Sequence, residues 1–407
     1  MGGFPNLEVL NLSFNGVSAA AIVALAEIPR LRDLEAPARR RLPPFVFAYL
    51  DSGTGHDVVR AANRAYYDSM TLTPRFLRGR IDADLSAAIL GQTYDAPFGV
   101  APIGLSSMIW PGAETILAAA ASRNGFPYTL STVAGDSIEN VAAAGGAHIW
   151  FQLYAAKDRD ITFDLLRRAR DCGVETLIVT ADVPAPSRRE RMRIAGAPLG
   201  SRGNSSFSPR VIWQSALHPG WALRMAAMGG PKFRNMAPYA DRHGNLPITS
   251  FIGQQLNGTL DWDYLQEIRA AWQGKMMLKG ILDGQDAVRA VGMGVDGLVL
   301  SNHGGRQLDA APHPLERLPA VRAAVGYNVP LVVDSGIQSG LDIVKALVCG
   351  ADFVLLGRAF MYAVAALGRD GGNHAAAVLL EEVRDVMAQL GVATIDRLRD
   401  VEINRRG

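Results

Sequence analysis

The densest group of polar residues lies at 301–309, SNHGGRQLD, directly after a short apolar run. His303 precedes Arg306 on a turn that two glycines make easy to form. An imidazole can act as a base near neutral pH, and a guanidinium can bind a carboxylate with two parallel hydrogen bonds. This spacing therefore places a base and a cation beside one small anionic substrate, which favours a catalytic role for His303 over a structural one.

Polar residues also end most of the other short apolar runs of the chain. They are Gln152, Thr180, Asp182, Lys279, Ser301, Asp334 and Arg358. Charged side chains are rarely buried unless they are paired or functional. The elements that carry these residues must therefore bring them together.

Eight runs rich in Val, Leu, Ile and aromatic residues recur, at 97–102, 127–132, 148–154, 176–182, 275–280, 297–302, 330–336 and 353–358. Alanine-rich stretches of helical period separate them, and several of these stretches end in Gly. Near-continuous apolar runs are typical of parallel strands covered on both faces. This α/β pattern predicts a single (β/α)8 TIM barrel, with an open doubly wound sheet as the rival. Because such barrels carry their chemistry at the carboxyl ends of the strands, we expect the polar residues to meet there.

Length and composition fit one large domain. The chain has 407 residues, of which 49% are hydrophobic, which excludes a disordered or collagen-like chain. A balance of 41 basic against 39 acidic residues, a net charge of +2, provides no field for nucleic acid. We therefore expect a globular protein with a small-molecule substrate.

Cysteine use and hydropathy bear on the compartment. Cys172 and Cys349 are too few for a disulfide framework or a zinc ribbon, and their apolar helical surroundings predict buried free thiols in a reducing compartment. No apolar run reaches the length that spans a bilayer, and residues 17–28 lack the basic start of a signal peptide. We expect a cytoplasmic protein without a metal site, either soluble or peripheral on the inner face of the membrane.

SNHGGRQLD resembles the most specific motif of the FMN-dependent 2-hydroxy acid oxidases and dehydrogenases. Supporting matches follow in order: RLPPFVFAYLDSG (41–53), WFQLY (150–154), T-x-D-x-P…RRE (180–190), LKGI (278–281), DSGI (334–337) and LLGRAF (355–360). The resemblance runs from about Arg39 to Leu390. It implies a barrel that binds FMN and oxidises an L-2-hydroxy acid to the 2-keto acid.

The resemblance also implies roles for individual residues. His303 matches the catalytic base, Asp182 its carboxylate partner, and Tyr154 the tyrosine that hydrogen-bonds the substrate hydroxyl. A carboxylate beside the imidazole would stabilise its protonated form. The residues that match the substrate carboxylate site are Tyr49, Arg189 and Arg306.

A further set of residues matches the FMN site. Lys279 matches the lysine near the flavin N1 side, where a cation stabilises the anionic reduced ring. The other matches around the ring are Pro102, Ile103 and Gly104 along one face, and Ser131, Gln152, Thr180 and Ser301 as hydrogen-bonding groups. The ribityl and phosphate end matches Asp334, Gly336, Gly357 and Arg358, at the last two strands.

Four positions depart from the family pattern. Gln338 stands where an arginine is usual in D-x-G-x-R, which predicts weaker FMN binding unless Arg358 and backbone N–H groups hold the phosphate. Ile103 is commonly Thr or Val. Val133 stands where some glycolate-preferring relatives carry Trp, and Gly104 where oxidases often carry Ala. Both changes are expected to enlarge the substrate pocket, which favours a lactate-like or bulkier, mandelate-like acid over glycolate.

Two segments lie outside the expected barrel repeat. Residues 1–38 are expected to form an N-terminal helical extension, and residues 39–407 the FMN-binding barrel; one leucine-rich-repeat spacing at 6–34 is too little for a solenoid. An insert at about 183–262 follows the fourth strand. Its first half could serve as a lid, a partner site or a membrane-contacting patch, and the stretch DWDYLQEIRAAW predicts an amphipathic helix that leads into the fifth strand.

The insert also bears on the electron acceptor. HPGWALRMAAMGG resembles the corresponding stretch of bacterial respiratory L-lactate dehydrogenases, whose electrons go to a membrane quinone. This favours a quinone-reducing dehydrogenase, with a hydrogen-peroxide-forming oxidase that uses oxygen as the alternative. Members of the family are often tetrameric, so we expect a homotetramer.

Two further readings compete with this family assignment. Other FMN barrels, such as isomerases or nitronate-type oxidases, lack the combined set of Tyr49, Tyr154, His303 and Arg306. A relative that has lost FMN would be suggested by Gln338 alone, and the complete catalytic set opposes it.

Overall fold

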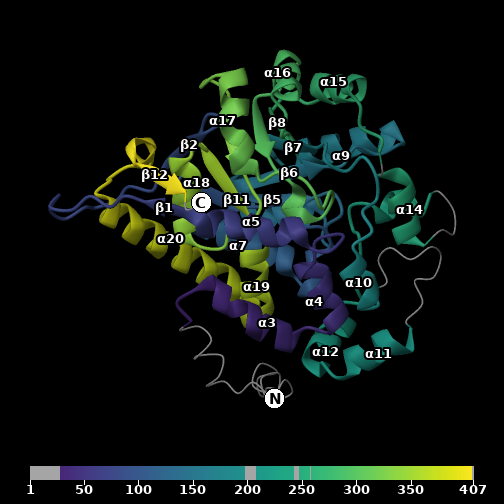
Figure 1. Ribbon diagram of the computed structural model, residues 1–407. Helices are drawn as coiled ribbons and strands as arrows, with labels where there is room; N and C mark the ends of the chain where they lie inside the picture. The colour runs from purple at the N-terminus through teal and green to yellow at the C-terminus, as the bar shows by residue number, and fades with distance from the viewer. Residues whose placement is uncertain (1–27, 198–207, 243–246, 257, 406–407) are drawn as a thin grey trace, which may run out of the picture.

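A closed barrel of eight parallel strands forms the centre of the molecule (Figure 1). The computed structural model describes residues 28–197, 208–242, 247–256 and 258–405. The barrel strands are β4 (Phe98–Val100), β5 (Tyr128–Ser131), β6 (Ile149–Leu153), β7 (Thr176–Thr180), β8 (Lys275–Lys279), β9 (Gly297–Leu300), β10 (Leu331–Val333) and β11 (Phe353–Leu356). Each of the eight predicted runs contains one of these strands, and the predicted TIM barrel is confirmed.

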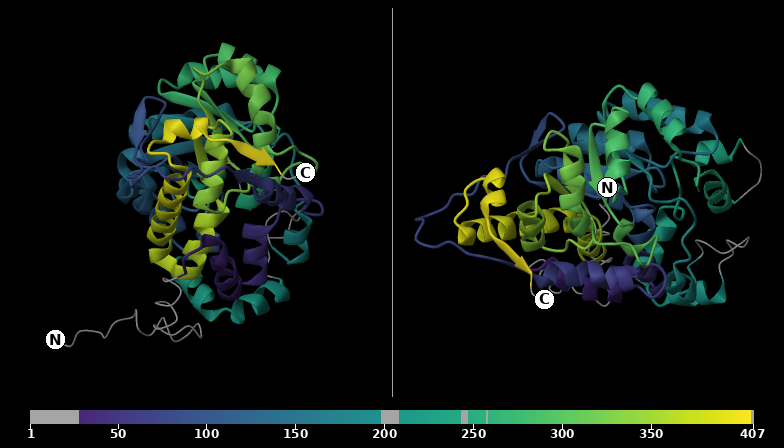
Figure 2. Two further views of the ribbon diagram at one scale, coloured as in Figure 1. Left: turned by 60° about the vertical axis from the view of Figure 1, so that its left-hand side comes forward. Right: turned by 45° about the horizontal axis from the view of Figure 1, so that its top comes forward.

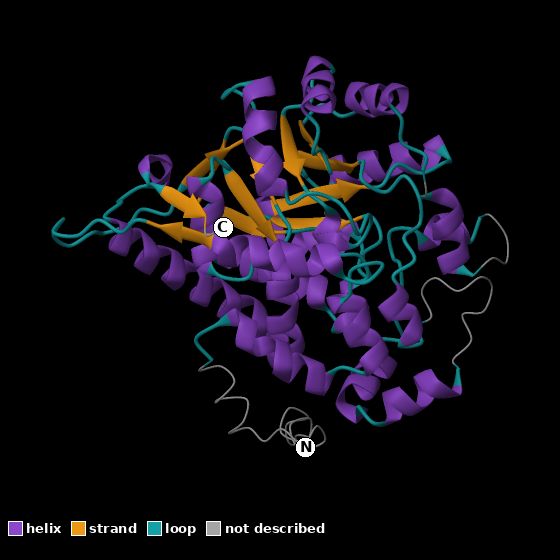
Figure 3. Cartoon of the chain, viewed as in Figure 1, coloured by secondary structure: helices purple, strands orange, loops and turns teal. Residues whose placement is uncertain are grey.

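Helices surround the strands, as the purple and orange ribbons of Figure 3 show. Those that follow or precede the barrel strands are α7 (Ala113–Arg123), α8 (Ile138–Gly145), α9 (Arg159–Asp171), α15 (Trp262–Ala271), α16 (Gly284–Gly292), α17 (Pro314–Val325), α18 (Gly340–Val348), α19 (Arg358–Leu367) and α20 (Gly371–Leu390). N-cap side chains fix where several of them begin: Ser137, Asp158 and Asp283 each accept a hydrogen bond from a backbone N–H in the first turn.

A short hairpin that the sequence did not reveal closes the end of the barrel at which the strands begin. It consists of β2 (Ala87–Ile89) and β3 (Gln92–Tyr94). Tyr94 packs against Trp150 and Phe353 inside the barrel, and its hydroxyl accepts a hydrogen bond from Trp150 Nε1 at 2.9 Å. Strands of three residues are too short for an alternating pattern to stand out. The hairpin leaves only the carboxyl ends of the strands open for a site.

The segment before the barrel packs onto it. It contains η1 (Leu31–Leu34), α3 (Glu35–Arg41), α4 (Pro44–Asp51) and α5 (Val58–Ser69). Leu31 and Leu34 are fully buried in the main core, and α3 crosses the expected boundary at residue 38. Most of the predicted extension, including its single repeat, lies outside the described residues.

The last described strand pairs with a segment that precedes the barrel. Strand β1 (Met70–Leu72) pairs antiparallel with β12 (Ile403–Arg405). The loop after β1 projects from the barrel in Figure 1 and in the right-hand view of Figure 2, and its Leu77 is wholly exposed.

The long insert between β7 and β8 consists of short helices. They are α10 (Glu190–Ile194), α11 (Pro209–Ala216), α12 (Pro219–Ala227), α13 (Ala237–Ala240) and α14 (Ile248–Gln255). The amphipathic helix predicted to lead into the fifth strand is α15, and Asp261 caps it. Within the described ranges, no helix combines the length and the apolar character needed to cross a membrane.

The two thiols are less enclosed than predicted. Cys172 and Cys349 are free but only partly buried. Each occupies the C-cap position of its helix, α9 or α18, where the chain turns toward the surface. The apolar pattern of the preceding helix therefore overstated their burial.

Candidate active site

His303 and Asp182 form the centre of the site at the open end of the barrel. His303 begins the 3-10 turn η3 (His303–Gly305) beyond β9, and Asp182 lies just beyond β7. The His303 Nδ1 atom lies 2.8 Å from Asp182 Oδ1, and Nε2 lies 3.5 Å from the Tyr154 hydroxyl. Burial alone would raise the pKa of Asp182, but His303 and Lys279 lower it below its ordinary value. The ionised carboxylate holds the proton on Nδ1, which leaves Nε2 free to accept another.

The turn that carries His303 needs its two glycines. His303, Gly304 and Gly305 have φ angles of +56°, +62° and +76°, all in the left-handed region. A Cβ on Gly304 would lie 2.7 Å from the Arg358 guanidinium, and one on Gly305 would lie 2.7 Å from the backbone nitrogen of Arg60. The glycines therefore let the turn lie directly against Arg358 and α5. A left-handed His is uncommon and is typical of functional sites.

Lys279 is the buried cation at the end of β8. Its Nζ lies 2.7 Å from Ser301 Oγ, 3.2 Å from Asp334 Oδ2 and 3.7 Å from Asp182 Oδ2. Burial alone would lower the pKa of Lys279, but Asp182 and Asp334 raise it above its ordinary value. The lysine is therefore a fixed positive charge among the ends of strands β7 to β10.

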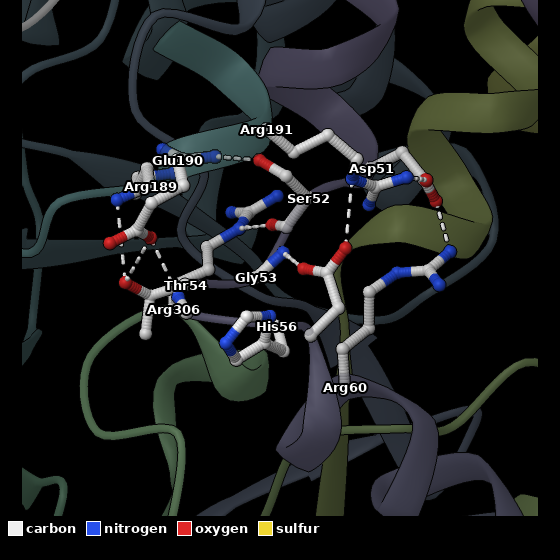
Figure 4. A network of polar contacts seen from close by, with 12 residues as sticks. Asp51, Ser52, Gly53, Thr54, His56, Arg60, Arg189, Glu190, Arg191 and Arg306 are labelled. Atoms are coloured by element: carbon white, nitrogen blue, oxygen red, sulfur yellow. Dashed lines mark hydrogen bonds and ion pairs between the residues drawn. The ribbon is translucent and has the colours of Figure 1, made fainter. Parts of the chain in front are cut away.

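Three partly or fully buried arginines converge on the last carbonyls of α4. Arg189 donates to the Tyr49 carbonyl at 2.6 Å, Arg306 to the Leu50 carbonyl at 2.5 Å, and Arg358 to the Ser52 carbonyl at 3.0 Å. Figure 4 shows the side chains of Arg189 and Arg306 directed at Ser52, the first at its hydroxyl and the second at its carbonyl. The last carbonyls of a helix lack partners within it and carry partial negative charge, so they attract cations.

None of the three arginines forms an ion pair with a carboxylate among the described residues, and the charge of Asp51 acts on Arg306 and Arg358 only from further away. Burial lowers the pKa of Arg306 to about 10, with a further contribution from Arg189. Burial also lowers the pKa of Arg358 to about 9, with a contribution from Arg306. All three remain cationic at neutral pH. Cations held at neutral carbonyls in this way are suited to binding anions.

Tyr49 and Gly104 lie beside Arg189. The Tyr49 hydroxyl donates to the Gly104 carbonyl at 2.6 Å, and the Arg189 guanidinium lies 4.9 Å from the centre of the Tyr49 ring. Burial raises the pKa of Tyr49, so its hydroxyl stays protonated. A Cβ on Gly104 would lie 2.8 Å from Val133 Cγ2. Val133 therefore occupies the space beside Gly104, and the expected enlargement of the pocket by these two residues stays a prediction.

A hydrogen-bonded row crosses strands β5, β6 and β7. The Ser131 hydroxyl donates to Gln152 Oε1, and Gln152 Nε2 donates to the Thr180 hydroxyl, each at 2.9 Å. The row is buried and extends toward Lys279 on β8 through the register that pairs Thr180 with Lys279. Thr180, at one end of the row, lines the cavity described below.

These groups surround one cavity of about 540 Å³. Its lining includes eleven of the predicted site residues: Pro102, Ile103, Tyr154, Thr180, Lys279, His303, Arg306, Asp334, Gly336, Gly357 and Arg358. The other seven predicted residues are not among those that line the cavity, but they contact its surroundings as described above. They are Tyr49, Gly104, Ser131, Gln152, Asp182, Arg189 and Ser301. The structure thus assembles the predicted set in one place.

Comparison with known proteins places this geometry in a family. The FMN-dependent dehydrogenase family matches residues 38–405. This chain belongs to the FMN-dependent dehydrogenase family. It is 41% identical over 365 residues to L-lactate dehydrogenase from Xanthobacter autotrophicus, covering 89% of this chain and 93% of that relative. It is 39% identical over 378 residues to L-lactate dehydrogenase from Pseudomonas entomophila, covering 92% and 98%.

Solved structures of related enzymes have the same fold. The monotopic membrane protein (S)-mandelate dehydrogenase matches with a TM-score of 0.86 at 33% identity, covering 93% of this chain and all (100%) of that one. Mandelate oxidase matches with a TM-score of 0.77 at 35% identity, covering 92% and 98%. The resemblance to FMN-dependent 2-hydroxy acid oxidases and dehydrogenases is confirmed, and FMN is the cofactor of the family.

The cavity of this FMN-dependent dehydrogenase suits that cofactor. Its volume lies in the range of small-molecule sites. Eight Lys and Arg side chains but only four Asp and Glu side chains line it, an excess of positive charge that suits a phosphate and a substrate carboxylate. Asp334 and Gly336 at the mouth of β10 would hold the ribityl and phosphate end, and Lys279 the N1 side of the ring.

Some residues that support this dehydrogenase site were missed in the sequence. Asn63 on α5 and Asn302 exchange hydrogen bonds between their side-chain amides at 2.9 and 2.7 Å, which ties α5 to the His303 turn. Glu114 is fully buried and accepts the backbone N–H groups of Ser107 and Gly135 at 3.0 and 2.8 Å, which joins the loops after β4 and β5. Asn302 lies within the motif and was within reach of prediction, whereas no local signal marked Asn63 or Glu114.

Proposed function

We propose that this enzyme oxidises an L-2-hydroxy acid to the 2-keto acid and passes the electrons through FMN to a membrane quinone. The observation that carries the proposal is the convergence of His303, Tyr154 and Arg306 on one cavity, with the charge of Arg189 close enough to act on Arg306. A 2-hydroxy acid offers one group for each of them.

The residues of the chain divide the work as follows. Arg189 and Arg306 bind the substrate carboxylate, and the Tyr49 hydroxyl turns from the Gly104 carbonyl to donate to it as well. Tyr154 orients the substrate hydroxyl, and His303 Nε2 accepts one proton during oxidation. The ionised Asp182 then stabilises the imidazolium. FMN, when bound, supplies the acceptor for the two electrons that leave the acid.

A lactate-sized acid is the substrate that we propose first. The curated relatives above are L-lactate dehydrogenases, at 41% and 39% identity. Val133 fills the space beside Gly104, which supports a small side chain rather than a large one. Mandelate, named for the solved relatives, is the bulkier alternative.

The insert supports the choice of a membrane acceptor. We define the insert face as the exposed apolar residues Ile194, Ile212, Trp213, Leu217 and Leu223, which are between 55% and 70% exposed. The basic residues Arg193 and Arg210 are exposed beside them. An apolar face with Trp and flanking Arg suits the water–lipid interface. This face would bring a cytoplasmic enzyme to the inner face of the membrane, where a quinone is available.

The first test is an anaerobic visible spectrum of the purified holoenzyme before and after addition of L-lactate. Bleaching of the flavin bands by L-lactate and not by D-lactate is the expected result. Recovery of the bands with a soluble quinone analogue, faster than with air, would identify a dehydrogenase. Faster recovery in air, with hydrogen peroxide formed, would identify an oxidase instead. If L-mandelate bleaches the flavin bands and L-lactate does not, the substrate is the bulkier acid rather than lactate.

The assembly state belongs to the same proposal. A homotetramer remains our prediction, and the projecting loop after β1 offers exposed Phe76 and Leu77 as contacts for a second copy. Light scattering coupled to size exclusion would measure the mass. A monomer at micromolar concentration would contradict the prediction.

A further inference from the structure

The phosphate end of the cavity lacks one cation that the family pattern leads us to expect. Gln338 replaces the arginine of D-x-G-x-R, and its backbone N–H donates to Asp342 Oδ2 at 2.9 Å. A phosphate monoester carries a charge of about −1.5 to −2 at pH 7. Arg358, at the start of α19, supplies only one positive charge.

Helix α5 brings another arginine to the same cavity. Arg60 lies in the first turn of α5 and lines the cavity together with Arg358, Gly336 and Gln338. Its backbone nitrogen lies where a Cβ on Gly305 would approach to 2.7 Å, so the start of α5 is pressed against the His303 turn. The position of Arg60 is thus set by the active-site turn, although it is far from residue 338 in the sequence.

Asp51 fixes the orientation of Arg60. The Asp51 carboxylate is buried between Arg60 and Arg191, and it also accepts the Tyr362 hydroxyl at 2.7 Å. Figure 4 shows this carboxylate between the guanidinium groups of Arg60 on α5 and Arg191 on α10. Arg191 also pairs with Asp57, whose Oδ2 lies 2.8 Å from the Arg191 Nε atom, so Asp51 is the carboxylate that holds Arg60 in place. The Nε atom of Arg60 is buried without a hydrogen-bond partner among the described residues.

The electrostatics of the cavity point the same way. Burial is the main cause of the lowered pKa of Arg358, and Arg306 and Arg60 add to it by like-charge repulsion. Arg60 and Arg358 therefore interact as two cations in one cavity. An anion bound between them would relieve that repulsion.

Arg64, one turn further along α5, is a less suitable candidate. Its guanidinium makes two contacts to Asp342, at 2.6 and 2.7 Å, and one to Asp68 at 2.9 Å. Two carboxylates thus pair with Arg64, whereas Arg60 pairs with Asp51 alone among the described residues.

We propose that Arg60 is the second cation of the FMN phosphate site and takes the place of the arginine missing at position 338. The inference concerns how the chain binds its cofactor, so it stands whichever acid is oxidised. A guanidinium binds phosphate through charge-assisted, bidentate hydrogen bonds, whereas riboflavin has no phosphate to bind.

The test compares FMN with riboflavin on the full-length apoprotein, by quenching of flavin fluorescence. Arg60→Gln should raise the dissociation constant of FMN about tenfold or more, as expected for loss of a charge-assisted contact, and leave that of riboflavin within about twofold. Arg60→Lys should retain part of the difference. Arg40→Gln, at an exposed arginine on α3 that is not among the residues lining the cavity, is the matched control and should change neither constant. Equal loss of FMN and riboflavin binding, or no loss of either, would overturn the proposal.

A second variant keeps the proposal testable if Arg60→Gln folds poorly. Gln338→Arg in the natural background should change FMN affinity by less than about threefold, because Arg60 already supplies the charge. In the Arg60→Gln background it should restore most of the lost affinity. A gain of about tenfold in the natural background would show that the phosphate site lacks a second cation, and Arg60 would then have no role in it.

Discussion

At the scale of single residues, the site is defined by its charged groups and by the partners of each. Asp182 contacts two basic side chains, since its oxygens lie 2.8 Å from His303 Nδ1 and 3.7 Å from Lys279 Nζ. Arg189, Arg306 and Arg358 have only carbonyl and hydroxyl partners among the described residues. In the proposed complex, the substrate carboxylate supplies the negative charge that balances Arg189 and Arg306.

Replacement of His303 should separate catalysis from binding. His303→Gln removes the proton acceptor, and general-base catalysis contributes typically about 10² to 10⁴ in rate. We expect the rate of anaerobic flavin reduction by L-lactate to fall by that factor in stopped-flow absorbance, with unchanged flavin content. The rate of flavin reduction should also fall in Asp182→Asn, because the uncharged amide no longer stabilises the imidazolium. Flavin reduction at the natural rate in His303→Gln would refute the assignment of the base.

Arg189 and its neighbour Arg188 form a natural matched pair. Arg189 contacts the α4 carbonyls, whereas Arg188 is exposed and only approaches Glu190, at 3.4 Å. Loss of a hydrogen bond to a charged group costs about 1.5–3 kcal/mol, so Arg189→Met should raise KM for the acid roughly 10- to 100-fold. Arg188→Met should leave it unchanged. Steady-state kinetics would decide, and equal effects of the two variants would remove Arg189 from the carboxylate site.

The contact between Gly104 and Val133 makes a specific prediction of non-additivity. Gly104→Ala places a Cβ 2.8 Å from Val133 Cγ2, which forces the loops after β4 and β5 apart or shifts Val133 into the substrate space. We expect a loss of about 1–3 kcal/mol in stability, as for other overpacked sites, measured by urea unfolding. The double variant Gly104→Ala, Val133→Ala should recover most of it. Additive losses in the double variant would mean that the two residues do not compete for space.

At the scale of elements, the insert is built onto the helices that carry the site. Gln214 of α11 accepts the Phe45 backbone N–H at the start of α4, at 2.9 Å. Trp221 of α12 donates to the Met108 carbonyl of α6 (Ser106–Ile109) at 3.0 Å and packs edge-on against Phe45. Deletion of the whole segment would therefore disturb α4 and α6, and surface substitutions are the cleaner test.

Substitution on the insert face should weaken membrane binding without loss of chemistry. Trp213→Ser with Leu217→Ser removes exposed apolar area, and we expect reduced cosedimentation with anionic phospholipid vesicles and slower reduction of a membrane-bound quinone. Flavin reduction by the acid should stay at the natural rate. Val288→Ser on α16, also exposed, is the control on another face. Unchanged vesicle binding would leave the insert face without a membrane role.

At the scale of the whole molecule, the barrel is closed at one end and open at the other. The β2–β3 hairpin fills one end, and the pairing of β1 with β12 links the segment before the barrel to the C-terminal part of the described chain. The cavity draws on strands from both halves of the barrel and on α3 and α5 as well. A ligand in it bridges elements that are far apart in the sequence.

FMN should therefore stabilise the folded state as a whole. A ligand at about 100 times its dissociation constant contributes about 2.7 kcal/mol when it binds only the native state. We expect the urea midpoint of the apoprotein to rise with FMN concentration and less so with riboflavin. A midpoint independent of FMN would contradict binding in this cavity.

The sequence by itself determined the strands and the residues at their ends. Parallel strands covered on both faces are continuous apolar runs, so each of the eight was visible locally, and their shared direction brings Thr180, Lys279 and Asp334 to one end. The family motif then identified the chemistry. These predictions succeeded because the information is local, or is fixed by the geometry of a closed parallel barrel.

Only the tertiary structure decided how the charges are arranged. Three contacts between distant segments illustrate this. The carbonyls of α4 accept hydrogen bonds from three arginines, Asp51 orients Arg60, and Val133 fills the space beside Gly104. Local spacing carries no signal for such contacts, because they depend on how helices outside the barrel pack across its open end. The same reason explains why the hairpin was missed and why the two cysteines are only partly buried. Their surroundings are set by packing rather than by neighbours in the chain.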